Sequence, residues 1–100
     1  MAVKVLKGEN FDDFIKEGNV VIDFYADWCG PCKMLKPIFE EASEKIKNVN
    51  FGKVNVDESS DLAQRFMVMS IPTILFFKDG KQIDRHSGVL HIEDIEKKFK

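Results

Sequence analysis

Both cysteines of this 100-residue chain lie in one short run, Trp28-Cys29-Gly30-Pro31-Cys32. Positions 20–25, just before it, are mostly apolar, which predicts a buried strand, whereas apolar residues recur at helical spacing over positions 35–46. A helix that begins at the motif directs its unpaired backbone N–H groups and the positive end of its dipole at the first sulfur. Both favour the thiolate, which is the species that attacks disulfides. The motif therefore predicts thiol–disulfide exchange.

Two other interpretations of the cysteine pair are less favoured. A zinc site needs four ligands, and beyond the two cysteines the chain offers His86 and His91 but no second cysteine pair. A purely structural disulfide is also disfavoured. It would close so short a loop that its loop-entropy stabilisation is only ~2 kcal/mol, against ~3 kcal/mol for a loop of fifteen residues. A CxxC pair at a strand-to-helix junction is typical of redox proteins.

Length and composition limit the class of protein. One hundred residues with 44% hydrophobic composition predict a single domain spanning residues 1–100. A net charge of −2 without a basic cluster argues against nucleic-acid binding. We expect no membrane span and no signal peptide, because the first residues lack an apolar stretch of the required length. These features predict a cytoplasmic protein, and in that reducing compartment a cysteine pair is more often catalytic than structural.

The apolar patterns predict a βαβαβαββα order, and hence a mixed sheet with helices on both faces. The expected strands cover 3–6, 20–26, 51–56, 73–77 and 82–87. The expected helices are one capped by Asn10, one over 31–47, one capped by Ser59 or Ser60, and one carrying Ile92, Ile95 and Phe99. Asp79-Gly80 is a hairpin signal that makes the last strand antiparallel to its predecessor.

Over its whole length the chain resembles thioredoxins. The resemblance rests on the segments 23–33, 53–57 and Ile71-Pro72-Thr73, together with the hairpin 76–80 and Gly88. It implies an α/β thioredoxin fold, with a central mixed five-stranded sheet flanked by four helices. It also implies a thiol–disulfide oxidoreductase and electron carrier that reduces protein disulfides and is itself re-reduced by a thioredoxin reductase.

The same resemblance implies a monomer that uses no cofactor or metal other than a redox-active Cys29–Cys32 disulfide. Its substrates would be disulfide-containing proteins of the ribonucleotide reductase or peroxiredoxin type. Two alternatives stay open from the residues alone. One is an oxidase or isomerase of the same fold, against which Gly30-Pro31 argues. The other is a redox-inactive binding subunit of a larger complex.

The resemblance also assigns roles to single residues near the motif. Cys29 would be the nucleophile, more exposed and more acidic than Cys32, which would be the buried resolving thiol. Asp23 would deprotonate Cys32, and Lys53 would modulate Asp23. Gly30 and Pro31 would tune the redox potential.

A flat docking surface for protein substrates is implied as well. It comprises Trp28, Ile71, Pro72, Gly88 and Val89, with Pro72 as a cis-proline facing the cysteines. The cis isomer rests on the resemblance, because only ~5–6% of X–Pro bonds are cis.

The residues support some of these roles independently. Asp23 interrupts an apolar strand, where a carboxylate is costly unless it is paired or neutralised. Its burial would raise its pKa and make it a base near neutral pH, whereas an Asp at a strand end could instead face solvent. Without the resemblance, Lys53 would be interpreted as a solvated strand residue. Met69 departs from the small or polar residue usual there, and either broadens apolar contact with partners or is an exposed residue without consequence.

Overall fold

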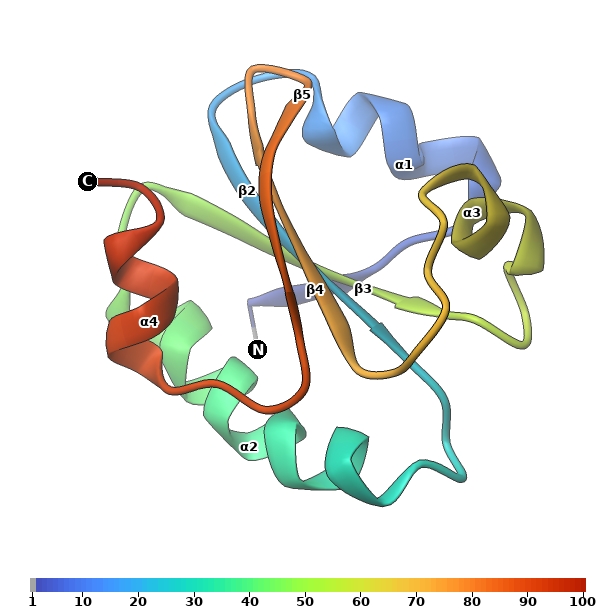
Figure 1. The fold of residues 1–100 in the computed structure, drawn as a ribbon. Helices are drawn as coiled ribbons and strands as arrows, with labels where there is room; N and C mark the ends of the chain where they lie inside the picture. The colour runs from blue at the N-terminus through green and yellow to red at the C-terminus, as the bar shows by residue number, and fades with distance from the viewer. Residues whose placement is uncertain (1) are drawn as a thin grey trace.

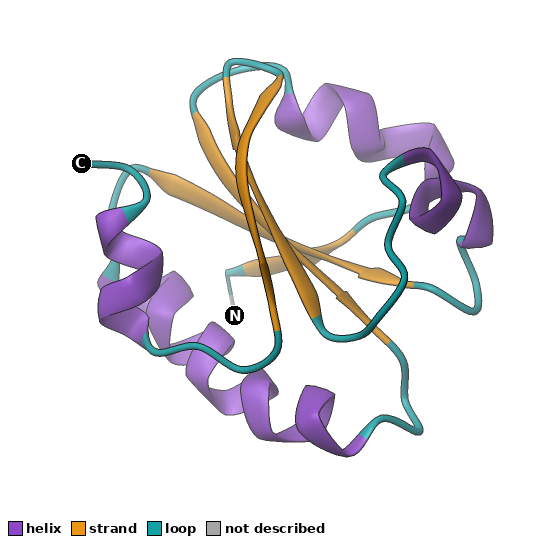
Figure 2. Cartoon of the chain, viewed as in Figure 1, coloured by secondary structure: helices purple, strands orange, loops and turns teal. Residues whose placement is uncertain are grey.

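The computed structural model describes residues 2–100 and contains the expected mixed sheet with four helices (Figures 1 and 2). The strands, in the spatial order β1-β3-β2-β4-β5, are β1 Val3–Val5, β2 Asn19–Tyr25, β3 Val49–Asn55, β4 Thr73–Lys78 and β5 Lys81–Ser87. The helices are α1 Gly8–Ile15, α2 Gly30–Lys45, α3 Ser60–Arg65 and α4 Ile92–Lys97. Within residues 2–100, none of these helices has the length and apolar character needed to cross a membrane.

The sheet separates two apolar cores. Helices α1 and α3 cover one face, and α2 and α4 cover the other (Figure 1). The first core is built around Phe11, Phe24 and Phe77, whose rings meet edge-on or tilted. The second contains Phe39, which stacks edge-to-face on Phe51 with ring centroids 5.1 Å apart. Burying each such ring contributes on the order of 1.5–3 kcal/mol, so the strands that carry these rings are held firmly on both sides.

Strand β2 lies at the centre of the sheet and decides where the site forms. It runs parallel to β3 and antiparallel to β4, with Phe24 opposite Thr73. The carboxyl ends of β2 and β3 and the amino end of β4 therefore meet at one edge of the sheet. The chain leaves β2 there to enter the cysteine motif, and the Ile71-Pro72 segment enters β4 at the same edge.

Two helix ends differ from the predicted ones. Helix α1 begins at Gly8 after Lys7, so Asn10 is not its N-cap; its side chain instead accepts a 2.7 Å hydrogen bond from the Lys7 N–H. Helix α2 ends at Lys45 rather than Lys47, because Ile46 turns to an extended conformation and is buried against the second core.

The hairpin was predicted correctly. Asp79 and Gly80 both adopt positive φ, at 50° and 87°, in the turn between the antiparallel strands β4 and β5. Positive φ at both central residues is what a tight two-residue hairpin requires.

Candidate active site

Cys29 and Cys32 form a disulfide across the first turn of α2, with Cα atoms 5.2 Å apart. Cys29 is the N-cap of this helix, and its Sγ accepts a 3.2 Å hydrogen bond from the Cys32 backbone N–H. Pro31 occupies the first turn, where backbone N–H groups have no acceptor within the helix, so the N–H that proline lacks costs the helix no hydrogen bond. An N–H donor and the positive end of a 16-residue helix thus both act on the Cys29 sulfur, and they stabilise negative charge there once the disulfide is reduced.

Exposure does not separate the two sulfurs in this oxidised state, contrary to the expectation that Cys29 is the more exposed. Cys29 is 4% exposed and Cys32 5%. The disulfide ties both side chains to the same turn, and both belong to a buried cluster with Ala26, against which Tyr25, Val56 and Ile71 pack. The difference between the cysteines lies instead in hydrogen bonding, because the helix N–H is donated to Cys29.

Asp23 lies in the middle of the central strand β2, with Lys53 beside it on β3 and Ile74 on β4. Asp23 is only 5% exposed, and its Oδ1 has no hydrogen-bond partner among the described residues. Burial raises the pKa of Asp23 from 3.8 to about 7, and the positive charge of Lys53 opposes part of that rise. A carboxyl group with this pKa exchanges a proton near neutral pH.

A cavity of about 220 Å³ connects Asp23 to Cys32. Its walls include Asp23, Cys32 and Lys53, with Lys33 and Lys36 from α2 on the same cavity. The buried carboxyl group and the second cysteine thus face one small space, large enough for water. The structure rules out the alternative that Asp23 points to solvent at a strand end.

Lys53 is half-buried rather than a freely solvated strand residue. Its Nζ lies 5.5 Å from the centroid of the Tyr25 ring, a cation–π distance. The ring thereby holds the ammonium group beside the Asp23 cavity, which is a role for the tyrosine that the sequence did not reveal.

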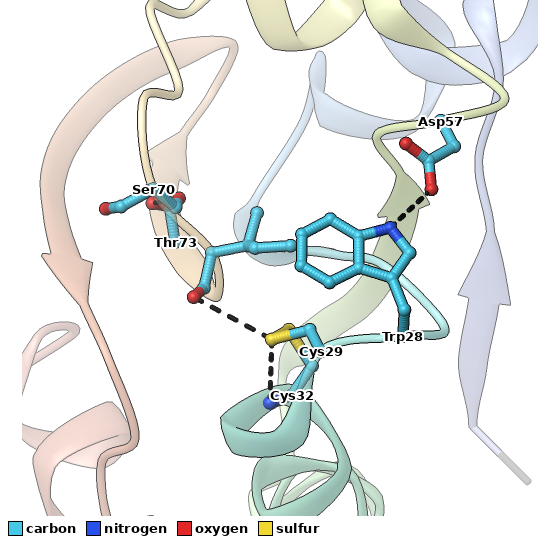
Figure 3. The surroundings of a disulfide bond; sticks show 7 residues. Trp28, Cys29, Cys32, Asp57, Ser70 and Thr73 are labelled. Carbon is cyan, nitrogen blue, oxygen red and sulfur yellow. Dashed lines mark hydrogen bonds between the residues drawn. A yellow bond between two sulfur atoms is a disulfide. The ribbon is translucent and has the colours of Figure 1, made fainter.

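The loop before β4 contacts the disulfide at Cys29, whereas the Asp23 cavity meets it at Cys32. The Ile71–Pro72 peptide bond is cis, the isomer that the resemblance implies. The Ile71 carbonyl oxygen lies 3.8 Å from Cys29 Sγ (Figure 3). Gly88, at a φ of 95°, donates its N–H to the Pro72 oxygen at 2.9 Å. The Ile71-Pro72 loop and the Gly88-Val89 segment are therefore joined at the edge of the site.

Trp28 is 70% exposed, and its Nε1–H donates a 2.9 Å hydrogen bond to Asp57 Oδ2 (Figure 3). Asp57 follows β3, so this bond joins the motif loop to the next strand end. Sequence reasoning gave Asp57 no role, because nothing along the chain indicates a partner 29 residues away.

Gly30 and Pro31 are both exposed beside the sulfurs. A Cβ added at Gly30 would meet no atom within 4 Å. Nothing within the described chain therefore demands glycine at this position, which leaves the face beside Cys29 open to an approaching partner.

Comparison with known proteins agrees with this geometry. A family model described as thioredoxin matches residues 2–100. Thioredoxin from Chlamydia pneumoniae is 48% identical over 87 residues, covering 87% of this chain and 85% of the relative. Thioredoxin-2 from Saccharomyces cerevisiae is 41% identical over 90 residues, covering 88% and 86%. The crystal structure of thioredoxin from Malassezia sympodialis superimposes with a TM-score of 0.89 at 38% identity, covering 98% of this chain and 91% of that one.

Proposed function

The chain belongs to the thioredoxin family, and on that premise we propose a role for each residue of the site in thiol–disulfide exchange. The protein is a thiol–disulfide oxidoreductase that reduces protein disulfides. The observation that carries the proposal is the pairing of two environments: the helix N–H on Cys29 Sγ, and the cavity shared by Cys32 and Asp23. A redox-inactive binding role is not favoured, because both cysteines are present at disulfide distance.

In the first step the Cys29 thiolate attacks one sulfur of a substrate disulfide. A bond forms between Cys29 Sγ and that sulfur, and the second substrate sulfur leaves as a thiolate that takes up a proton. The Cys32 N–H and the α2 dipole stabilise the attacking thiolate. Gly30 and Pro31 shape the turn that aims this N–H and so tune the redox potential.

In the second step Cys32 attacks Cys29 Sγ in the mixed disulfide. The bond between Cys29 Sγ and the substrate sulfur breaks, and the substrate leaves with both sulfurs reduced. Two electrons have then passed to the substrate, and Cys29 and Cys32 are oxidised to a disulfide. The Cys32 thiol must first lose its proton, and Asp23, with a pKa of about 7, is the acceptor across the cavity. Lys53 modulates Asp23 by favouring its ionised form.

Substrates dock on the surface around Cys29. Trp28 supplies an exposed apolar ring held by Asp57. Ile71 and Pro72 place a backbone segment against Cys29 Sγ, and Gly88 with Val89 extends that surface.

We further propose that the protein acts as a cytoplasmic monomer and electron carrier, and that it needs no cofactor beyond its own cysteine pair. A thioredoxin reductase returns it to the dithiol state. Its substrates are disulfide-containing proteins of the ribonucleotide reductase or peroxiredoxin type.

Reduction of insulin, followed as turbidity, tests this function. The wild type should catalyse the reaction with dithiothreitol, and also with NADPH and a purified thioredoxin reductase. Cys29→Ser should abolish catalysis. Cys32→Ser should instead accumulate a mixed disulfide through Cys29, visible by mass spectrometry. Undiminished turnover by Cys29→Ser, or a mixed disulfide on Cys32 in that variant, would refute the assigned roles.

A further inference from the structure

The methionines of residues 2–100 are all exposed, and two of them lie close together before the Ile71-Pro72 loop. Met67 is 71% exposed and Met69 93%, whereas Met34 is exposed elsewhere, on α2. Methionine is among the residues most often buried in folded proteins. Two exposed methionines in one segment therefore call for a physical explanation.

The two methionines line a hollow continuous with the docking surface. One hollow is bounded by Trp28, Val56, Val68, Met69, Ser70 and Ile71. The adjoining hollow, bounded by Ser60, Ala63, Gln64, Met67, Val68 and Met69, continues toward α3. They share Val68 and Met69, and their described walls contain no charged residue. An apolar track therefore leads from Trp28, beside the disulfide, to α3.

The backbone at Met67 is unusual for a side chain of this kind. Its φ is +53°, in the left-handed region. The Met67 N–H bonds to the Gln64 oxygen at 3.1 Å, and the Val68 N–H bonds to the Ala63 oxygen at 2.8 Å. This is the Schellman pattern that ends a helix, and its left-handed position is usually glycine. A large apolar side chain is thus displayed at a position where it costs conformational energy, and such strain is concentrated at functional sites.

Arg85 of β5 holds this segment in place. Its guanidinium donates to the Met67 oxygen at 3.3 Å and also to the Phe66 oxygen. These bonds satisfy carbonyl groups at the end of α3 and tie the segment to the edge strand. The two methionine side chains therefore project from a fixed backbone, while their own unbranched chains stay adaptable.

We infer that Met67 and Met69 are specificity-determining residues, which bind an apolar side chain of the protein substrate beyond its disulfide. The inference rests on the proposed function. The occupant is an uncharged, apolar segment of a disulfide-bearing protein, because the track is continuous with the docking surface and its walls are uncharged. The exposed Glu58 and Asp61, within two residues of Ser60 in the chain, disfavour an acidic segment. Thioethers accommodate apolar side chains of differing shape, so several substrates fit.

Two synthetic peptides test the inference. Both are disulfide-linked homodimers, with either Leu or Ser at the positions two to five residues on each side of the cysteine. Reduction of each is compared with that of bis(2-hydroxyethyl) disulfide, which is too small to reach the methionines. Met67→Ser/Met69→Ser should lower kcat/KM for the Leu peptide roughly tenfold, equivalent to about 1.4 kcal/mol. The same variant should keep its kcat/KM for the Ser peptide and for the small disulfide. The control variant Met34→Ser should keep its kcat/KM for all three substrates.

A second variant separates recognition from folding. Met67→Gly relieves the left-handed strain, so its melting temperature should rise while kcat/KM for the Leu peptide falls. Equal losses on both peptides, or no loss on either, would overturn the inference. Failure of the wild type to reduce even the small disulfide would instead overturn the proposed function. Light scattering gives a further check: a dimer that dissociates in Met67→Ser/Met69→Ser would assign the track to a second copy of the chain.

Discussion

Replacing Asp23 by Asn should stabilise the oxidised protein in a way that depends on pH. The folded-state pKa of Asp23 is raised from 3.8 to about 7 by burial. Between these values the folded chain holds a proton that the unfolded chain has lost, so wild-type stability falls as pH rises from about 4 to about 7. The gap corresponds to about 4 kcal/mol, because one pKa unit is worth about 1.4 kcal/mol. Asn has the same shape but no charge, and it escapes this loss.

Urea unfolding of both proteins at half-unit intervals from pH 4 to pH 8.5 would measure the effect. The difference in unfolding free energy should grow by about 1.4 kcal/mol per pH unit in favour of Asp23→Asn, then level off above about pH 7. Other titrating groups are common to both proteins and cancel. Asp27→Asn is the matched control, because Asp27 lines the same cavity but is exposed. A difference that stays constant with pH would refute the argument that Asp23 is buried with a raised pKa.

Three further predictions concern the cysteines and their neighbours. In the reduced protein at neutral pH, iodoacetamide should alkylate Cys29 before Cys32, because the helix N–H stabilises the Cys29 thiolate; peptide mapping that finds Cys32 labelled first would reverse their roles. Pro31→His should raise the redox potential by roughly 30 mV or less, because a cation beside the thiolate favours the dithiol form and 30 mV corresponds to ~1.4 kcal/mol. If equilibration with glutathione gives an unchanged or lower potential, Pro31 does not tune it. Lys53→Met should raise the pKa of Asp23 further, because the Lys53 charge lowers that pKa. The pH midpoint of mixed-disulfide resolution, measured by single-turnover kinetics, should then move above about 7. An unchanged midpoint would show that Lys53 does not act through Asp23.

The chemistry at the centre of the site could be predicted from the sequence because its parts are local. Cys29 and Cys32 lie within one helical turn, and the change from strand to helix periodicity around them is visible in the chain. The position of Asp23 in an apolar run likewise indicated a buried carboxyl group. Its proximity to Cys32 did not follow from the run itself, since that depends on where α2 packs against the sheet.

Two expectations were wrong for different reasons. Asn10 is a good N-cap by residue type, but α1 starts at Gly8, and from the first turn the Asn10 side chain accepts a hydrogen bond from the Lys7 N–H, which is a local interaction. The expected difference in exposure between Cys29 and Cys32 is absent, because both side chains lie in one buried cluster, against which Val56 and Ile71 from other segments pack. The partner of Trp28 was not foreseen either, since Asp57 reaches it only through the parallel pairing of β2 with β3.

Residue type and spacing over one or two turns were enough to predict the chemistry of the cysteine motif, the order of strands and helices, and their apolar faces. Which distant groups share the site depends instead on how the elements pack together. Sheet pairing brings the Ile71 carbonyl to Cys29 Sγ and Lys53 beside Asp23, and the end of α3 sets Met67 in a left-handed conformation. The physical reason is that burial, pKa and backbone strain depend on neighbours contributed by other segments, and packing alone selects those neighbours.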